Sequence, residues 1–405
     1  MANRVIEYIE SKWNDVIREN REDDGTLIGL PYPYIVSGIA DKFKEMYYWG
    51  TFFTNRGLEI TGRWDLVKNN TDNMLYLVDK YGFMPNGNRT YYLKNSQPPF
   101  LSIMVRDVFE HYGDPTWLAS AYRVLCKEYK FWQTKRMTSV GLNQYGGHFS
   151  DDQIEEKAAS FAKRVGMRPE NKTDRELADH YIICCESGID CSARWEFDGP
   201  DYAQVDLNSL LYIFEQNMAF FAKTLGEADE AAWIAAAEKR RSRMLKYMDK
   251  DGVFYDYNVK TGEVNQFFTC ASVYPLFANM VNKTYAENFV KNLGKLELEY
   301  GVSYTEKHNF PGEYQWDTKI GWPCIQYLLV KALDNNGYPK VAERIAEKYL
   351  GLVEKVFDET GTLWEKYNIE EGNDNVSAEY TMPPILGWTA AAYLVFNNYL
   401  ETGKI

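Results

Sequence analysis

Apolar residues repeat at helical spacing along most of the chain, and this periodicity limits the fold more than any other feature. Leu207, Leu211, Phe214, Met218 and Phe221 follow one another at alternating spacings of four and three residues. Such spacing places all five side chains on one face of a helix. Stretches that alternate between apolar and polar residues are scarce by comparison. The sequence therefore predicts an all-α fold.

Similar patterns predict helices near both ends of the chain and at many positions between them. The further predicted helices cover residues 43–61, 64–80, 98–112, 114–134, 173–185, 227–248, 284–294, 320–335 and 383–400. One short β-hairpin is predicted over residues 252–262, because Gly252 and Gly262 mark turns at its two ends. Since no Pro- or Ser-rich linker divides the chain, we expect residues 1–405 to form a single domain.

Long polar and aromatic loops separate these helices, which favours an architecture of helices paired in a ring. In such a toroid the loops gather at one end and carry the binding residues over a rigid scaffold. A right-handed solenoid of helical repeats is the alternative. No fixed period of about 30–50 residues supports it.

The charge balance bears on possible partners. The chain has 45 Lys and Arg residues against 58 Asp and Glu residues, which gives a formal net charge of -13. Because binding to nucleic acids or anionic membranes depends on basic side chains, neither partner is expected. The first residues carry charges where a secretory signal needs an apolar stretch, and the six cysteines form no CxxC pair. We therefore expect a cytoplasmic protein.

The sequence contains none of the common nucleotide, metal or serine-hydrolase motifs. There is no GxGxxG after a predicted strand, no GxxxxGK[ST], no HExxH and no GxSxG. The four histidines, His111, His148, His180 and His308, are dispersed singly along the chain. The sequence therefore predicts neither a metal site nor a cofactor.

Carboxylates lie among aromatic residues in several predicted loops. A pyranose offers C–H faces for stacking and hydroxyl groups for carboxylates, so this pattern indicates a sugar site. Hydrolysis of an acetal needs one protonated carboxyl group and one carboxylate. Asp190 and Glu365, beside Trp364, are candidates for these two roles. An apolar wall formed by Ile189 or Trp195 would raise the pKa of Asp190.

Several segments, in chain order, resemble the motifs of trehalases, glycoside hydrolase family 37: residues 42–49 (KFKEMYYW), 85–99, 168–170, 186–190, 205–212, 315–322, 364–367, 379–380 and 387–388. The resemblance implies an (α/α)6 toroid and an inverting glycosidase without a cofactor, acting on trehalose or a related small α-glucoside. By position, Asp190 matches the general acid of the family and Glu365 the general base. The positions that the resemblance assigns to substrate binding are Lys42, Phe43, Trp49, Gly50, Asn86, Asn95, Gln97, Arg168, Glu170, Gly188, Trp316 and Glu379.

The chain departs from the family pattern in the residues expected to bind the sugar. Gly50 stands where the family has Asp, while Lys42 and Asn95 replace expected arginines. The segment before Glu379 also lacks the usual glycine-rich sequence. Gly50 has two interpretations: a natural change that makes room for another sugar or aglycone, or an engineered substitution that weakens the enzyme for trapping a ligand.

Two other functions remain open on the sequence alone. The related glycoside hydrolase family 63 has small members that act on glucosylglycerate, mannosylglycerate or α-glucosyl disaccharides. The replacements at Lys42, Gly50 and Asn95 also fit a weakened or non-catalytic sugar-binding protein. Retention of both Asp190 and Glu365 argues against a pure binder, since binding alone needs no acid and base pair.

Overall fold

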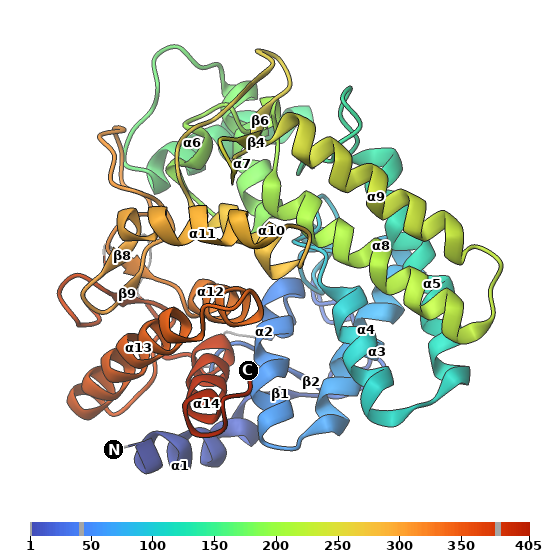
Figure 1. Ribbon diagram of the computed structural model, residues 1–405, viewed down its shortest axis with the longest axis vertical. Coiled ribbons are helices and arrows are strands. Elements are labelled where there is room, and N and C mark those ends of the chain that lie inside the picture. The colour runs from blue at the N-terminus through green and yellow to red at the C-terminus, as the bar shows by residue number, and fades with distance from the viewer. Residues whose placement is uncertain (1, 40–43, 377–381) are drawn as a thin grey trace.

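The computed structural model describes residues 2–39, 44–376 and 382–405, and within these ranges helices dominate (Figure 1). Six helices form an inner ring: α2 (Tyr48–Ile60), α4 (Leu101–Tyr112), α8 (Val205–Leu225), α10 (Tyr274–Phe277), α12 (Pro323–Asn335) and α14 (Gly387–Thr402). Six more lie outside them: α1 (Ala2–Lys12), α3 (Trp64–Tyr81), α5 (Pro115–Lys135), α9 (Glu230–Tyr247), α11 (Lys283–Asn292) and α13 (Pro339–Thr360). The predicted (α/α)6 toroid is confirmed.

One helical pair is added to this ring. Helices α6 (Ile154–Arg164) and α7 (Asp174–Ser187) pack against each other in the connection between α5 and α8. The sequence predicts α7 but not α6. The capping box that Thr173 and Glu176 form at the start of α7 is a clear helix signal, whereas α6 is short and has no side-chain cap.

Short antiparallel strand pairs connect some of the helices. They are β1 (Ile17–Arg18) with β2 (Tyr34–Ile35), β4 (Asp249–Lys250) with β5 (Val253–Phe254), β8 (Glu297–Leu298) with β9 (Gly301–Val302), β10 (Ile320–Gly321) with β11 (Tyr367–Asn368), and the three-stranded set β3 (Tyr202–Ala203), β6 (Tyr257–Asn258) and β7 (Glu263–Val264). The hairpin predicted over 252–262 is therefore two pairings, β4 with β5 and β6 with β7, each closed by one of the two predicted turns.

The start of α2 also differs from the prediction. The predicted helix begins at residue 43, but residues 44–47 lie outside helix and Tyr47 is extended. The backbone N–H of Met46 donates to Asn88 Oδ1 at 2.7 Å, and Met46 O accepts the N–H of Asn88. Because these bonds hold the chain against the loop around Asn88, the helix cannot begin earlier.

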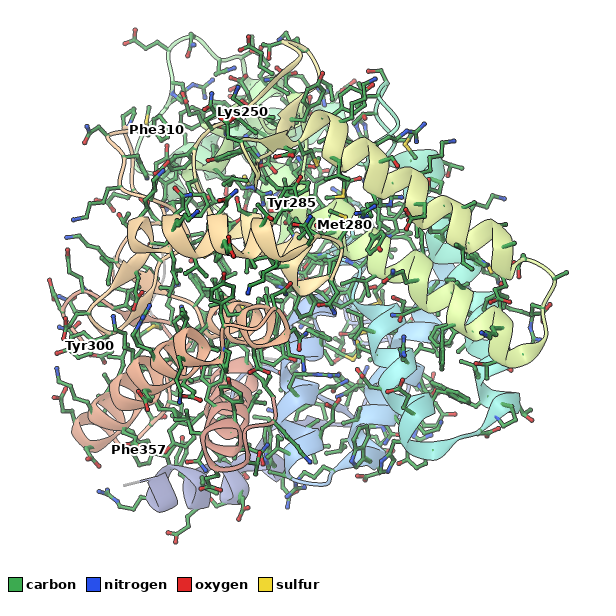
Figure 2. All side chains as sticks on the ribbon, in the orientation of Figure 1. Lys250, Met280, Tyr285, Tyr300, Phe310 and Phe357 are labelled. Carbon is green, nitrogen blue, oxygen red and sulfur yellow. The ribbon has the colours of Figure 1, made fainter. Side chains whose placement is uncertain are left out.

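Aromatic side chains fill the space between the helices. Phe52 of α2 stacks on Phe100, just before α4, with ring centroids 4.1 Å apart. On the outer side, Phe357 of α13 meets Tyr8 of α1 edge-on at 5.1 Å. Figure 2 labels Phe357 beside α13, and it shows Tyr285 of α11 close to Met280. Aromatic contacts therefore join helices on both the inner and the outer side of the ring.

Residues far apart in sequence close the inner ring. Helices α2 and α14 lie side by side, and an added Cβ at Gly57 would lie only 2.7 Å from Ala391 Cα. A glycine in a helix interior costs roughly 0.5–1 kcal/mol relative to alanine. At Gly57 this cost is offset because only a hydrogen side chain lets the two backbones approach so closely.

A buried ionic network joins the loops at one end of the ring. The guanidinium of Arg194 donates two hydrogen bonds to Asp256 and one to Asp206, each of 2.7 Å, and another to Tyr304 Oη at 2.9 Å. Asp256 also accepts the N–H of Val205, the first residue of α8. All of these side chains are buried, so the charges compensate one another away from water.

We expect Gly57→Ala to destabilise the protein by about 1–3 kcal/mol, because the added methyl group must push α2 and α14 apart. Gly351→Ala is the matched control, since Gly351 lies inside α13 with open space around its Cβ position. Its substitution should stabilise the protein by about 0.5–1 kcal/mol. Urea unfolding of both variants tests this; a shift of the same sign in both would contradict the close-contact explanation.

Candidate active site

A cavity of about 630 Å³ opens where the N-terminal ends of inner helices meet the connecting loops. Trp49 and Gly50 lie in the first turn of α2, Trp322 directly precedes α12, and Trp388 lies in the first turn of α14. Backbone N–H groups at helix N-termini carry partial positive charge, which favours carboxylates nearby. The helices thus provide a rigid and weakly electropositive floor.

Asp190 reaches this cavity from the turn that ends α7. Gly188 ends the helix in the left-handed conformation, with φ of 73°, and an added Cβ there would lie 2.6 Å from the Trp49 ring. Only glycine meets both conditions. Ser187 Oγ then accepts the N–H of Ile189 at 3.1 Å and fixes the following turn. This geometry directs the Asp190 side chain to the cavity, where 35% of it remains exposed.

The surroundings of Asp190 favour its protonated form. Burial raises the pKa of Asp190, and the nearby charge of Glu365 raises it further. Arg164 opposes the shift, since its guanidinium Nη2 lies 3.5 Å from Asp190 Oδ2. Neither Ile189 nor Trp195 lines the cavity, so the predicted apolar wall is not formed by these two residues. Trp195 instead donates its indole N–H to Asp256 at 2.7 Å.

Glu365 reaches the same cavity from the loop before β11, and a buried lysine lies beside it. Lys366 Nζ lies 3.1 Å from Glu365 Oε2 and also donates to Gln315 Oε1 at 2.9 Å. The indole N–H of Trp388 donates to the Glu365 carbonyl oxygen at 3.0 Å, which fixes the backbone. Burial lowers the pKa of Lys366, although the Glu365 charge acts in the opposite direction.

Four tryptophans form an aromatic wall on the cavity. Trp316 and Trp322 stack face to face, with ring centroids 3.8 Å apart and planes inclined by 4°. Trp388 meets both rings edge-on, and Trp49 lies 5.6 Å from Trp316. Such a wall gives broad apolar contact area at low entropic cost, and it suits the C–H faces of a sugar.

The structure brings half of the predicted substrate-binding positions to this cavity. The predicted residues that line it are Trp49, Gly50, Asn86, Gln97, Gly188 and Trp316. Asn95 lies behind them, where its carbonyl oxygen accepts the N–H of Asn86 at 3.0 Å. Lys42, Phe43 and Glu379 fall outside the described residues, so the structure says nothing of them.

Arg168 and Glu170, two predicted substrate-binding residues, do not line this cavity. Both side chains are exposed, and Arg168 pairs with Asp174 at the start of α7 rather than lining the cavity. Arg164, at the end of α6, lies against Asp190 instead. Arg164 is missing from the predicted site because α6, the helix that carries it, was not predicted.

Other lining residues were also missed as site residues. Among them are Glu45, Tyr47, Tyr92, Tyr181 and Gln315. Glu45 and Tyr47 lie within the first motif, and Gln315 precedes Trp316, so proximity to a predicted residue was the available signal. The hydroxyl groups of Tyr47 and Tyr92 lie 3.0 Å apart, and Tyr47 also donates to Glu45 Oε1.

Neither a metal centre nor a membrane span is found in the part of the chain that the structure describes. Among these residues, no cluster of three or more His, Cys, Asp or Glu side chains is suited to a metal ion. Within the same ranges, no helix has the length and apolar character needed to cross a membrane.

Comparison with known proteins agrees with this geometry. The family model for trehalase matches residues 1–401. A periplasmic trehalase of Escherichia coli O1:K1 is 30% identical over 411 residues, which cover 95% of this chain and 72% of the relative. The periplasmic trehalase of E. coli K12 gives the same identity and coverage.

Two solved structures share the fold. Neutral trehalase from Saccharomyces cerevisiae superposes with a TM-score of 0.84 at 24% identity, over 99% of this chain and 94% of that one. A mannosylglycerate hydrolase of family 63 from Thermus thermophilus gives a TM-score of 0.66 at 15% identity, over 97% and 100% of the two chains.

The relatives also correct one prediction from the sequence. The curated relatives are periplasmic trehalases, which contradicts the cytoplasmic location expected from the first residues and the cysteines. Since both the family model and these relatives match nearly the whole chain, the chain belongs to the trehalase family and is a glycosidase.

Proposed function

We propose that the chain hydrolyses the α-glucosidic bond of trehalose, or of a closely related α-glucoside, with inversion at the anomeric carbon. One observation carries this proposal: Asp190 and Glu365, from separate loops, both line a single cavity walled by tryptophans. The names of the curated relatives support trehalose as the substrate. We further propose that residues 1–405 act as one catalytic domain.

Asp190 is the general acid in this proposal. A general acid must hold its proton until the glycosidic oxygen needs it, and burial shifts the pKa of Asp190 in that direction. As the bond breaks, the proton passes from Asp190 to the leaving oxygen. The charge then left on Asp190 is stabilised by Arg164 beside it.

Glu365 is the general base. It accepts a proton from the water that attacks the anomeric carbon on the face opposite the leaving group. The Lys366 ammonium stabilises the negative charge that Glu365 needs before this step. Each carboxyl group thus has one basic neighbour, with Arg164 Nη2 at 3.5 Å from Asp190 and Lys366 Nζ at 3.1 Å from Glu365.

The remaining cavity residues orient the sugar. In this proposal Trp49 and Trp316 stack on its C–H faces, while Asn86 and Gln97 contact its hydroxyl groups. Gln97 Oε1 accepts the N–H of Trp49 at 3.2 Å, so its amide NH2 group remains to face the ligand. Gly188 keeps Trp49 in place by leaving room for its ring.

A second function deserves a test because of Gly50. An added Cβ at Gly50 would meet nothing closer than Tyr47 Cβ at 3.9 Å, so this position has room for another group. The space could hold a different sugar, as in the family 63 enzyme of similar fold. The same loss of a carboxylate also fits a weakened sugar-binding protein.

Asp190→Asn and Glu365→Gln should each lower kcat on trehalose by at least about 10²-fold while leaving the fold intact, because each removes one proton transfer. On α-glucosyl fluoride, whose leaving group needs no acid, Asp190→Asn should recover activity and Glu365→Gln should not.

Glu313→Gln is the control for these variants, since Glu313 is exposed in the loop before Trp316 and does not line the cavity. Its kcat should match that of the wild type. Near-normal turnover of trehalose by Asp190→Asn would overturn the assignment of the acid.

The raised pKa of Asp190 also predicts how stability changes with pH. Below about pH 4 this carboxyl group is protonated in both the folded and the unfolded chain. As the pH rises, the unfolded chain ionises first, so the folded wild type loses stability until the pH passes the raised folded pKa. Asp190→Asn should therefore unfold at a higher temperature than the wild type at pH 7, and the difference should shrink towards pH 4. A less stable variant at pH 7 would contradict this.

Gly50→Asp separates the functions. If trehalose is the substrate, the restored carboxylate should raise kcat/KM by about 10- to 150-fold, the equivalent of one charged hydrogen bond. Gly50→Asn, of the same size without the charge, is the control and should gain less. Turnover of mannosylglycerate or glucosylglycerate without a gain on trehalose would support the second function, and turnover of no α-glucoside would support a binding protein.

A further inference from the structure

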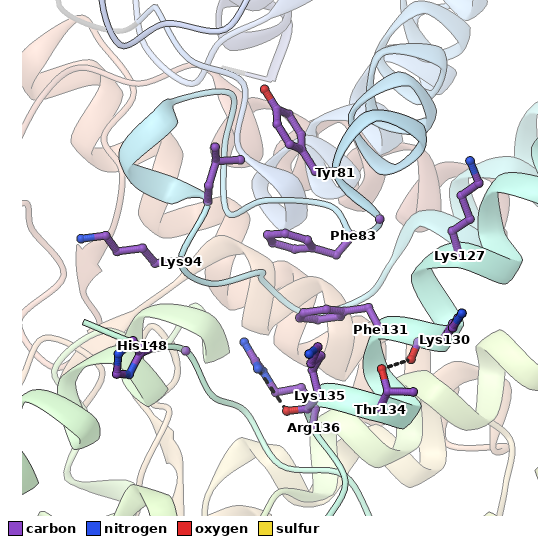
Figure 3. Close-up of a pocket in the computed structure, with 13 residues that line it drawn as sticks. Tyr81, Phe83, Lys94, Lys127, Lys130, Phe131, Thr134, Lys135, Arg136 and His148 are labelled. Atoms are coloured by element: carbon purple, nitrogen blue, oxygen red, sulfur yellow. Dashed lines mark hydrogen bonds between the residues drawn. The ribbon is translucent and has the colours of Figure 1, made fainter. Parts of the chain in front are cut away.

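A second cavity, of about 580 Å³, lies away from the catalytic cavity, and its charge is opposite to that of the chain as a whole (Figure 3). It is bounded by the end of α3, the last two turns of α5, and the loops around residues 93–94 and 147–148. Five of its lining side chains are basic: Lys94, Lys127, Lys130, Lys135 and Arg136. No carboxylate is found among the described residues that line it. In a chain with net charge -13, this is a local concentration of positive charge.

The face of α5 accounts for this concentration. Lys127, Lys130, Phe131, Thr134 and Lys135 follow the i, i+3, i+4, i+7, i+8 spacing, which puts them on one side of the helix. Figure 3 shows Phe83 and Phe131 facing each other between Lys94 and His148 on one side and Lys127 and Lys130 on the other. The two phenyl rings stack at 4.8 Å with planes inclined by 17°. The cavity thus has an apolar centre and a basic rim.

The basic side chains of this cavity differ in whether they already pair with a carboxylate. Arg136 is fixed, because it donates hydrogen bonds of 2.7 and 2.8 Å to the buried Glu186, and it lies 4.8 Å from the centre of the Phe131 ring. Lys127 pairs with Asp79 at the surface. For Lys130 and Lys135, no carboxylate partner is found among the residues that the structure describes. These two ammonium groups flank Phe131 and can meet an anion without breaking an existing pair.

We propose that this cavity binds an organic phosphate, with its phosphate group between Lys130 and Lys135 and its carbon portion on Phe83 and Phe131. A phosphate carries up to two charges and several acceptor oxygens, which two lysines and the nearby Arg136 can meet together. The phenyl rings favour a phosphate that carries a sugar or base over inorganic phosphate, because only the former offers surface to bury. A hexose phosphate and a nucleotide share this chemistry.

Calorimetric titration of the full chain at low ionic strength tests the proposal, with glucose 6-phosphate, ATP and inorganic phosphate as separate probes. Glucose 6-phosphate or ATP should bind at least about tenfold more tightly than inorganic phosphate, and the probe that does so identifies the source. The double variant Lys130→Glu, Lys135→Glu should weaken that binding by at least about tenfold. Added salt should weaken it as well.

The matched control is Lys283→Glu, Lys291→Glu, two exposed lysines on α11 far from this cavity, which should leave binding unchanged. Phe83→Ala should weaken binding of the organic probe and not that of inorganic phosphate. No binding by the wild type, equal loss in both double variants, or equal affinity for inorganic phosphate would each overturn the proposal. Circular dichroism and thermal unfolding test that each variant is folded, whether or not the chain hydrolyses trehalose.

Discussion

The buried guanidinium of Arg194 holds together the parts of the chain that form the catalytic cavity. It lies four residues after Asp190 and binds Asp206 of α8, Asp256 before β6 and Tyr304 after β9. A charge in this position is tolerated because two carboxylates compensate it, and loss of one partner typically costs about 3–5 kcal/mol. The loop that carries Asp190 is therefore tied to three distant segments, which keeps the acid in a fixed place relative to the ring.

Much of the fold could be predicted from the sequence, because helical periodicity is a local property. The spacing from Leu207 to Phe221 predicts α8, and predicted helices such as 114–134 differ from the observed α5 by one residue at each end. The two failures have different causes. Helix α2 begins late because Asn88, 42 residues away in sequence, holds residue 46 in the neighbouring loop, and no local pattern shows this contact. Helix α6 fails for a local reason, because it is short and lacks the side-chain cap that would mark its start.

The site residues also fall into those that the sequence predicts correctly and those that it does not. Trp49, Gln97 and Trp316 lie within the motifs, and all three reach the cavity as predicted from the sequence. Arg168 and Glu170 match the family motif in order, but α6 and α7 bring Arg164 to Asp190 instead. A motif fixes the residue types along the chain, whereas the packing of the surrounding helices determines which side chains reach the cavity. The basic cavity on α5 cannot be predicted from the sequence, because its lining residues come from four separate segments.

The contact between Gly57 and Ala391 has a consequence for how the protein is made. These residues lie near opposite ends of the chain, and their helices complete the inner ring. Contacts at such large sequence separation form late, because the entropy of closing a long loop must be lost before they contribute. Until α14 packs against it, α2 therefore has one face uncovered. The catalytic cavity, which needs both Trp49 and Trp388, is completed only when these two helices meet.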